Sequence, residues 1–411
     1  MFFKRVFLLI LTLVFVSNYI VYADVSQKNV SYDNIVTEYY SDDIYEDVVV
    51  TSSIPVTSVP EIHSKSAILM EASTGKVVFS KDENVRLPPA SITKIMTMLL
   101  VIEAIESKKI SFYDKVSTSE HAASMGGSQI WLEVGEEMTV HDLLKAVAVG
   151  SANDASVALA EHISGSEEGF VALMNYKAKE LGMKNTKFTN ACGLDEENLY
   201  SSAKDVAIMS RELISHDIIK QYTTIWMDTI RNESVQLVNT NKLVRFYRGA
   251  TGLKTGTTNG AGCCLSATAK REDMELIAVV MGADSSNERF SDAKKLLDYG
   301  FANLCIYKTS DNVKFKTKIN VSGGQKDSVG LKYDTIQNEL TETDNKSSIS
   351  VVQEISDSIS APVSKGQCVG LVKVLLNDKV IKKYKIYASE DVKKLNFSFC
   401  FFNLLNSLIK I

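Results

Sequence analysis

The sequence predicts an α+β protein in which helices pack on a mainly antiparallel sheet, followed by a small all-β domain. Three observations support this fold class. A hairpin pattern spans residues 67–79, helical periodicity dominates residues 90–215, and strand patterns return in residues 252–282. Because strands lie on both sides of the helical stretch, we expect them to form one sheet that the helices cover.

The composition is that of a globular protein. The chain has 411 residues, of which 45% are hydrophobic and 23% charged, so it is long enough for two folded domains. The formal net charge is -5 at pH 7. A chain without a basic field lacks the electrostatic footprint of a nucleic-acid-binding protein, and we set that class aside.

The first residues have the pattern of an export signal. Lys4 and Arg5 precede an apolar run at residues 6–16, and Ala23 is a small residue suited to cleavage before Asp24. We therefore interpret residues 1–23 as a signal peptide and expect an exported protein. An uncleaved membrane anchor is the alternative, although the run is short for a bilayer span.

A linker and a first domain follow. Residues 24–60 are rich in Asp, Glu, Ser, Thr and Tyr without periodicity, which predicts a disordered acidic linker. The first domain, residues 61–304, opens with the hairpin. We then expect helices at residues 90–102, 140–149, 154–163, 170–181, 202–215 and 287–299, and strands at residues 252–257, 263–269 and 275–282.

The remaining residues have a different hydrophobic pattern. In residues 313–319 apolar residues alternate with lysines, and residues 371–376 and 380–387 form a hairpin pattern, so residues 305–390 are predicted to be a small all-β domain. Residues 391–411 place Phe and Leu on one face of a helix and Asn on the other, which predicts an amphipathic helix at a membrane surface. A terminal helix that packs on the core is the alternative.

Cysteine and histidine spacing indicates no metal site. The six cysteines lack paired ligand spacing, and we interpret them mostly as packing residues, with a disulfide left open. The five histidines form no metal-binding pattern. These residues are Cys192, Cys263, Cys264, Cys305, Cys368 and Cys400, and His63, His121, His141, His162 and His216.

Ser91 and Lys94 form the first motif with chemical potential, Ser-x-x-Lys at the start of a predicted helix. A spacing of three residues brings both side chains to one helix face. A serine hydroxyl becomes a good nucleophile when a base removes its proton, and a lysine with a lowered pKa is such a base. Taken alone the motif is weak, because most such pairs are simply solvated.

Two further motifs complete a set. Ser151 and Asn153 lie between two predicted helices, where a loop projects polar side chains, although both residue types are common there for structural reasons. Lys254, Thr255 and Gly256 lie on a predicted strand. There a cation and a hydroxyl suit a substrate carboxylate, while glycine lets a substrate backbone approach, and an edge strand would fit this role.

In this order, on a helix, a loop and a strand, the three motifs resemble the signature of penicillin-binding proteins and β-lactamases. The chain is similar to the D-alanyl-D-alanine carboxypeptidase family of low-molecular-mass penicillin-binding proteins from about Ser66 to Lys394. Cys192 and Thr257 depart from the histidines that many relatives carry. The stretches that carry the resemblance are residues 89–97, 126–128, 153–155, 190–195 and 252–256.

The resemblance implies a penicillin-binding/β-lactamase-like transpeptidase fold and a serine-type carboxypeptidase that removes the terminal D-alanine from peptidoglycan stem peptides. It implies that Ser91 forms the acyl-enzyme and that Lys94 is its base. Ser151, close to Lys254, would relay a proton to the departing amine, and Asn153 would orient Lys94.

The resemblance also assigns the binding strand. Lys254 and Thr255 would bind the terminal carboxylate, beside Gly256, and the backbone N–H groups of Ser91 and Thr257 would form the oxyanion hole. β-Lactams would acylate Ser91 as inhibitors, and no metal or organic cofactor is required. The protein would lie at the outer face of the cytoplasmic membrane or in the cell wall, anchored by its C-terminal helix.

Three other functions remain as alternatives. A class A β-lactamase needs a deacylating glutamate, for which Glu196 is only a faint match because Tyr200 stands where asparagine is expected. A D,D-endopeptidase would use the same machinery on crosslinks. A catalytically inactive wall-binding protein is disfavoured by the intact motifs. The sequence leaves open the preferred stem peptide and the oligomeric state.

Overall fold

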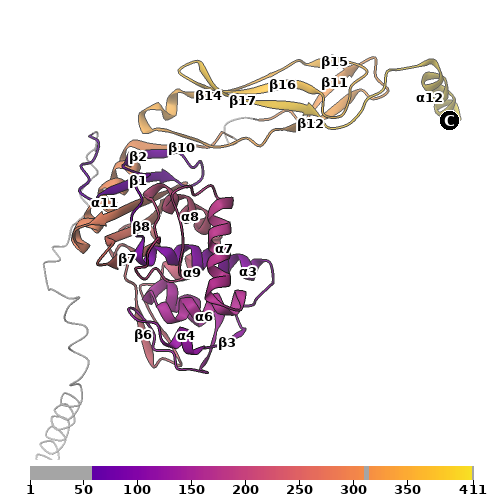
Figure 1. The fold of residues 1–411 in the computed structure, drawn as a ribbon. Helices are drawn as coiled ribbons and strands as arrows, with labels where there is room; N and C mark the ends of the chain where they lie inside the picture. Colours follow the sequence, from indigo (N-terminus) through magenta and orange to yellow (C-terminus); the bar gives the residue numbers. More distant parts are fainter. Residues whose placement is uncertain (1–57, 310–313, 410–411) are drawn as a thin grey trace, which may run out of the picture. The chain divides into compact units, whose positions relative to one another are not determined.

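A computed structural model describes residues 58–309 and 314–409. The predicted signal peptide and residues 24–57 of the predicted linker lie outside the described residues. The first described region is built on a five-stranded sheet with the order β2-β1-β9-β8-β7, antiparallel throughout (Figure 1). Its strands are β1 (Ser66–Glu71), β2 (Val77–Lys81), β7 (Ala250–Thr258), β8 (Gly262–Arg271) and β9 (Met274–Ala283).

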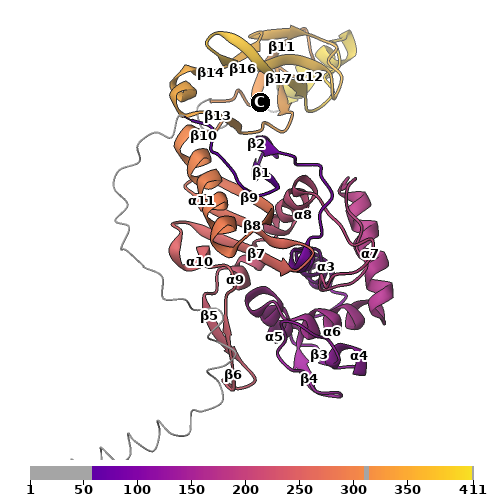
Figure 2. The same cartoon turned by 60° about the vertical axis from the view of Figure 1, so that its left-hand side comes forward.

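Both faces of this sheet are covered. In β1, Ile68 contributes to the core on one face and Leu69 to the core on the other, and Ile277 and Leu276 divide in the same way in β9. Side chains that alternate across a strand and are all buried require a layer on each side. Helix α11 (Ser286–Asn303) packs on β8 and β9, and α8 (Ala203–Ser215) packs on β1 and β9 from the opposite face (Figure 2).

The helical layer confirms the predicted helices and adds shorter elements. Polar N-caps mark several starts: Ser166 accepts from the Gly169 N–H before α7, and Ser202 accepts from the Asp205 N–H before α8. The remaining elements of this layer are α3 (Lys94–Glu106), α4 (Glu120–Ala123), α5 (Val140–Lys145), α6 (Asn153–Ser164), α7 (Glu167–Glu180), α9 (Lys220–Thr223) and α10 (Leu243–Phe246), with the hairpins β3 (Lys115–Ser117) with β4 (Glu137–Thr139) and β5 (Met227–Ile230) with β6 (Val235–Val238).

The predicted helix at residues 90–102 begins differently from a regular α-helix. Residues Ala90–Thr93 form a 3-10 turn (η1), and α3 starts only at Lys94. Ala90 has a φ of 49°, outside the right-handed helical region, so the chain enters the helix through a sharp turn. Helix α3 is buried around most of its circumference, as expected for a helix that runs through the middle of a core.

The C-terminal region contains a second sheet, with the order β14-β16-β17-β12-β11-β15. The predicted hairpin is confirmed, and its turn residues Asn377 and Asp378 both have positive φ, as a two-residue type I′ turn requires. The strand predicted at residues 313–319 is only partly right. Val313 lies outside the described residues, and the strand begins at Lys318. The strands are β11 (Lys318–Ser322), β12 (Ser328–Tyr333), β14 (Ile349–Ile355), β15 (Ser358–Ser360), β16 (Cys368–Leu376) and β17 (Lys379–Ala388), with β10 (Leu304–Tyr307) paired to β13 (Glu339–Glu342).

The last described element is α12 (Phe397–Ile409), where an amphipathic helix was predicted. Its large apolar side chains are exposed, among them Phe397, Phe402 and Leu408. Within residues 58–309 and 314–409, every helix is too short or too polar to span a bilayer.

Candidate active site

The turn that carries Ser91 is fixed by two glycines from distant segments. A Cβ atom on Gly193 would lie 1.9 Å from the Ala90 carbonyl oxygen. A Cβ atom on Gly256 would lie 2.8 Å from the Pro89 carbonyl oxygen. Only glycine permits these approaches. The loop at residues 190–194 and strand β7 therefore both press directly against the Ser91 turn.

Lys94 lies one turn after Ser91 and is completely buried. Its Nζ lies 2.9 Å from Ser91 Oγ, 2.6 Å from Asn153 Oδ1 and 2.7 Å from the Cys192 carbonyl oxygen. All three partners are uncharged, and the charge of the nearby Asp154 carboxylate offsets only part of the loss of hydration. Burial accordingly lowers the pKa of Lys94 to about 8. An amine with this pKa is neutral in about one tenth of the molecules at pH 7.

Asn153 is the first residue of α6 and is held on three sides. Its Nδ2 donates to the Gly126 carbonyl oxygen at 2.6 Å, and its backbone N–H donates to the Ser128 carbonyl oxygen at 2.7 Å. The donation through Nδ2 leaves Oδ1 as the acceptor for Lys94. The amide orientation is therefore determined by its partners.

Ser151 follows a π-helical turn, Ala146–Gly150, and takes up the left-handed conformation, with φ 61° and ψ 29°. A serine in this region is uncommon, and its cost is of the kind found at functional sites. Ser151 is buried, yet its hydroxyl has no hydrogen-bond partner in the described part of the chain. It is thus available to a bound molecule.

Strand β7 lies at the edge of the sheet, as expected, and carries the third motif. Lys254 is buried and donates to the Thr255 carbonyl oxygen at 3.2 Å. Burial, together with the nearby charges of Lys94 and Arg289, holds the pKa of Lys254 well below its usual value. The Thr255 hydroxyl donates to Thr240 Oγ1 at 2.7 Å.

Several contributors to this arrangement had no recognisable role in the sequence. Arg289 on α11 donates to the Gly256 carbonyl oxygen at 3.1 Å and to Thr257 Oγ1 at 2.8 Å, which fixes the end of β7. Asn190 Oδ1 accepts the backbone N–H groups of Cys192 and Gly193, which shapes the loop that holds Lys94. Neither Arg289 nor Asn190 belongs to a motif that carries chemistry. The only sequence signal was the resemblance around residues 190–195.

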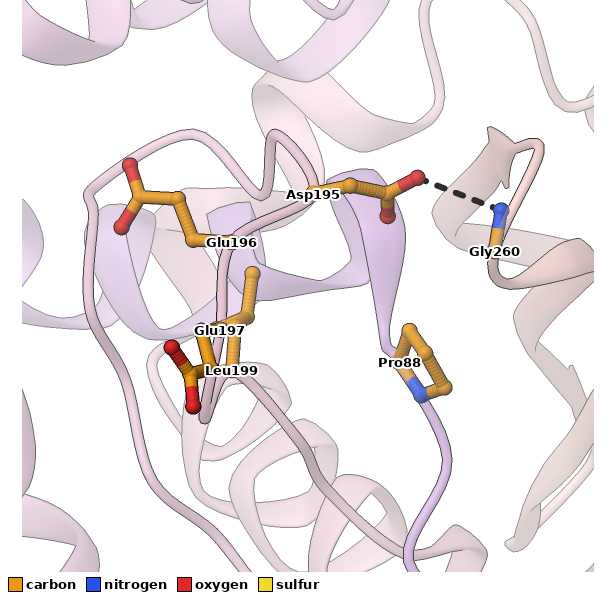
Figure 3. Close-up of a pocket in the computed structure, with 6 residues that line it drawn as sticks. All are labelled: Pro88, Asp195, Glu196, Glu197, Leu199 and Gly260. Atoms are coloured by element: carbon orange, nitrogen blue, oxygen red, sulfur yellow. Dashed lines mark hydrogen bonds between the residues drawn. The ribbon is translucent and has the colours of Figure 1, made fainter.

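A pocket of about 300 Å³ is lined by Pro88, Asp195, Glu196, Glu197, Leu199 and Gly260 (Figure 3). Pro88 lies two residues before Ala90, where the turn that carries Ser91 begins. The Asp195 carboxylate is directed toward Gly260, whose N–H donates to it at 3.2 Å (Figure 3). The same carboxylate accepts from the Thr258 hydroxyl at 2.7 Å. Asp195 therefore ties this loop to the end of β7. Glu196, the residue faintly similar to a deacylating glutamate, lies in this pocket lining.

Comparisons with known proteins agree with this geometry. The D-alanyl-D-alanine carboxypeptidase family matches residues 54–285, and the C-terminal domain of penicillin-binding protein 5 matches residues 301–394. D-alanyl-D-alanine carboxypeptidase DacF of Bacillus subtilis is 47% identical over 341 residues, which cover 81% of this chain and 87% of that protein.

Solved structures give the same result. The structure of penicillin-binding protein 5 from Haemophilus influenzae aligns with a TM-score of 0.70 and 32% identity, over 82% of this chain and 99% of that one. Penicillin-binding protein D2 from Listeria monocytogenes in its ampicillin-bound form aligns with a TM-score of 0.55 and 30% identity, over 59% of this chain and 99% of that one. The expected transpeptidase fold and the all-β C-terminal domain are confirmed.

Proposed function

Because this chain belongs to the D-alanyl-D-alanine carboxypeptidase family and is a serine-type hydrolase of that kind, we propose that Ser91 forms its acyl-enzyme. The observation that carries the proposal is the contact between Ser91 Oγ and the buried Nζ of Lys94 at 2.9 Å. The substrate is a peptidoglycan stem peptide ending in D-Ala-D-Ala, and the leaving group is its terminal D-alanine.

Acylation begins with proton transfer. Neutral Lys94 takes the proton from the Ser91 hydroxyl as Oγ attacks the carbonyl carbon of the penultimate D-alanine. The new Oγ–C bond forms while the ammonium of Lys94 is stabilised by the amide oxygen of Asn153 and the carbonyl oxygen of Cys192. These two acceptors also aim Nζ at Ser91, so no reorganisation is needed before the attack.

Collapse of the tetrahedral intermediate breaks the C–N bond. The departing amine of D-alanine needs a proton, which Ser151 relays from Lys254 or Lys94. The left-handed backbone at Ser151 and its unengaged hydroxyl support this role. Water then hydrolyses the ester and releases the shortened peptide. A β-lactam acylates the same serine, with its ring amide in place of the D-Ala-D-Ala bond.

The edge strand β7 holds the substrate. Lys254 and Thr255 bind the terminal carboxylate, and Gly256 lets the peptide backbone approach. An anionic carboxylate beside Lys254 opposes the effect of burial and of the neighbouring cations, so substrate binding favours the charged ammonium. The contact of Gly256 with the Ser91 turn supports an oxyanion hole formed by the N–H groups of Ser91 and Thr257.

We further propose that the protein is exported and that α12 anchors it in the membrane interface. Phe397, Phe402 and Leu408 leave 83%, 63% and 62% of their surface exposed, which is costly in water and favourable at a lipid surface.

The test of the membrane anchor is sedimentation of the full chain with lipid vesicles. Phe402→Asp should abolish binding and Asn403→Asp, an equal charge change on the polar face, should weaken it only slightly. Equal loss in both variants would contradict the anchor.

The decisive experiment on the active site measures D-alanine released from a diacyl-D-Ala-D-Ala peptide and, in parallel, cleavage of a crosslinked muropeptide. Ser91→Ala should abolish both reactions and the labelling by a fluorescent penicillin. Labelling that persists in this variant would show that another residue is the nucleophile. Cleavage of the crosslink alone would identify an endopeptidase, and rapid turnover of penicillin a β-lactamase.

A further inference from the structure

A second cluster of ionisable side chains lies at the end of α3 opposite to Ser91. One carboxylate oxygen each of Glu103 and Glu212 and a ring nitrogen of His216 lie within 4.8 Å of one another, and all three residues are partly buried. Glu212 and His216 are four residues apart at the end of α8, and Glu103 comes from the last turn of α3. The packing of α3 against α8 brings these groups together.

The imidazole of His216 is prepared for a ligand. Its Nδ1 lies 2.8 Å from Glu106 Oε2, and hydrogen bonding to a carboxylate favours the tautomer with the proton on Nδ1. Its Nε2 is buried and has no hydrogen-bond partner within the described residues. A buried polar atom without a partner is unfavourable unless a water molecule, an ion or a ligand binds it.

A carboxylate on Nδ1 and an open Nε2 form the arrangement that supports histidine ligands of metals. Two carboxylates and one imidazole suit a first-row divalent ion, zinc above all, with water completing its coordination. We propose that Glu103, Glu212 and His216 bind Zn²⁺, with Glu106 as the residue that orients the imidazole.

The charges around the cluster are compatible with a cation. Lys177 Nζ lies 2.7 Å from Glu103 Oε1 and is the one basic group that contacts the three ligands within the described residues. Lys177 also pairs with Glu180, at 3.2 Å. This second ion pair keeps Lys177 in place when Glu103 binds the metal. Glu103, Glu106 and Glu212 together exceed the charge of Lys177.

The site would join the last turn of α3 to the last turn of α8. It contains no residue of the acylation machinery, which lies around the first turn of α3. Zinc would therefore stabilise the fold through mass action and leave the chemistry at Ser91 unchanged.

The test uses the untagged full chain, freed of metal by chelation and titrated with ZnCl2 in a calorimeter. We expect one site per chain that His216→Gln removes. His121→Gln is the matched control, because His121 also contacts a carboxylate, Glu167, but lies outside the cluster. Saturating zinc should raise the melting temperature of the wild type and of His121→Gln by about 3 °C, and that of His216→Gln by none.

Two further measurements separate the site from adventitious binding. Co²⁺ in place of zinc should give visible bands without the thiolate charge-transfer absorption that binding to a cysteine would produce. Glu106→Gln should weaken zinc affinity by about 10–100-fold and leave penicillin labelling intact, which also shows that the variant folds. The proposal is overturned if the wild type binds no zinc at millimolar concentration, or if both His216→Gln and Glu106→Gln bind it unchanged.

Discussion

The two ends of α3 use lysine in opposite ways. At its start, Lys94 is buried among uncharged acceptors, and its pKa falls to about 8. Near its end, Lys177 of α7 meets Glu103 and Glu180; burial acts to lower its pKa, but the hydrogen bonds to these carboxylates outweigh it and the pKa is raised. The residue type is the same, and hydrogen bonds to carboxylates decide whether burial lowers the pKa of the lysine or is outweighed.

Removal of the proposed base, Lys94, should have the largest effect. Lys94→Gln keeps a polar side chain of similar length but cannot accept the proton from Ser91, so we expect penicillin acylation to slow by about 10³-fold. Stopped-flow acylation measures this rate. Lys177→Gln is the matched control and should change the rate by less than about twofold. Similar losses in both variants would mean that the two lysines do not differ as described.

A sharper test gives Lys94 a carboxylate partner like the one that Lys177 has. Asn153→Asp places a carboxylate beside Lys94, as Glu103 stands beside Lys177. The ion pair should raise the pKa of Lys94 and slow acylation at pH 7 by about 100-fold. If the pKa of Lys94 is the cause, the rate should recover at higher pH. A loss that is the same at every pH would assign Asn153 a purely geometric role.

The pH profile of the wild type follows from the same pKa. Because the proposed acylation needs neutral Lys94, its rate should rise about tenfold per pH unit below pH 7 and level off above about pH 8. The second-order rate constant with a β-lactam, measured from pH 5.5 to pH 9.5, gives this profile. A rate that is flat between pH 6 and pH 8 would show that Lys94 is not the titrating base.

The smallest effect is expected at the far end of α3. Glu103→Gln removes the charge that pairs with Lys177 in a partly exposed position, so the free energy of unfolding should fall by only about 0.5 kcal/mol in the absence of metal. Urea unfolding of the metal-free protein measures it. Acylation should be unchanged, and a slower acylation would indicate that the two ends of the helix are coupled.

The motifs could be predicted because each consists of residues close in sequence. Ser91 and Lys94 lie one helical turn apart, and Lys254 to Thr257 follow one another on a strand, so local periodicity was enough to place them on their elements. The sheet order was not accessible in the same way, because the pairing of β1 with β9 joins residues about two hundred positions apart. The strand predicted from residue 313 began later because alternation alone does not set a strand's first residue.

The details that tune the site came from contacts that no local pattern records. Lys94 donates to the backbone carbonyl oxygen of Cys192, so the residue type at position 192 does not indicate this contact. Arg289 reaches β7 from a helix that follows β9. Ser151 was found by its motif, but its left-handed backbone was not.

By itself, the sequence determined the fold class, the three motifs and, through resemblance, the family, because these reside in residue types and short spacings. Only the tertiary structure decided the protonation of Lys94, because a pKa depends on burial and on the charges that surround the group. It also brought His216 to Glu103, which no histidine spacing indicated, because these residues meet only when α8 packs on α3.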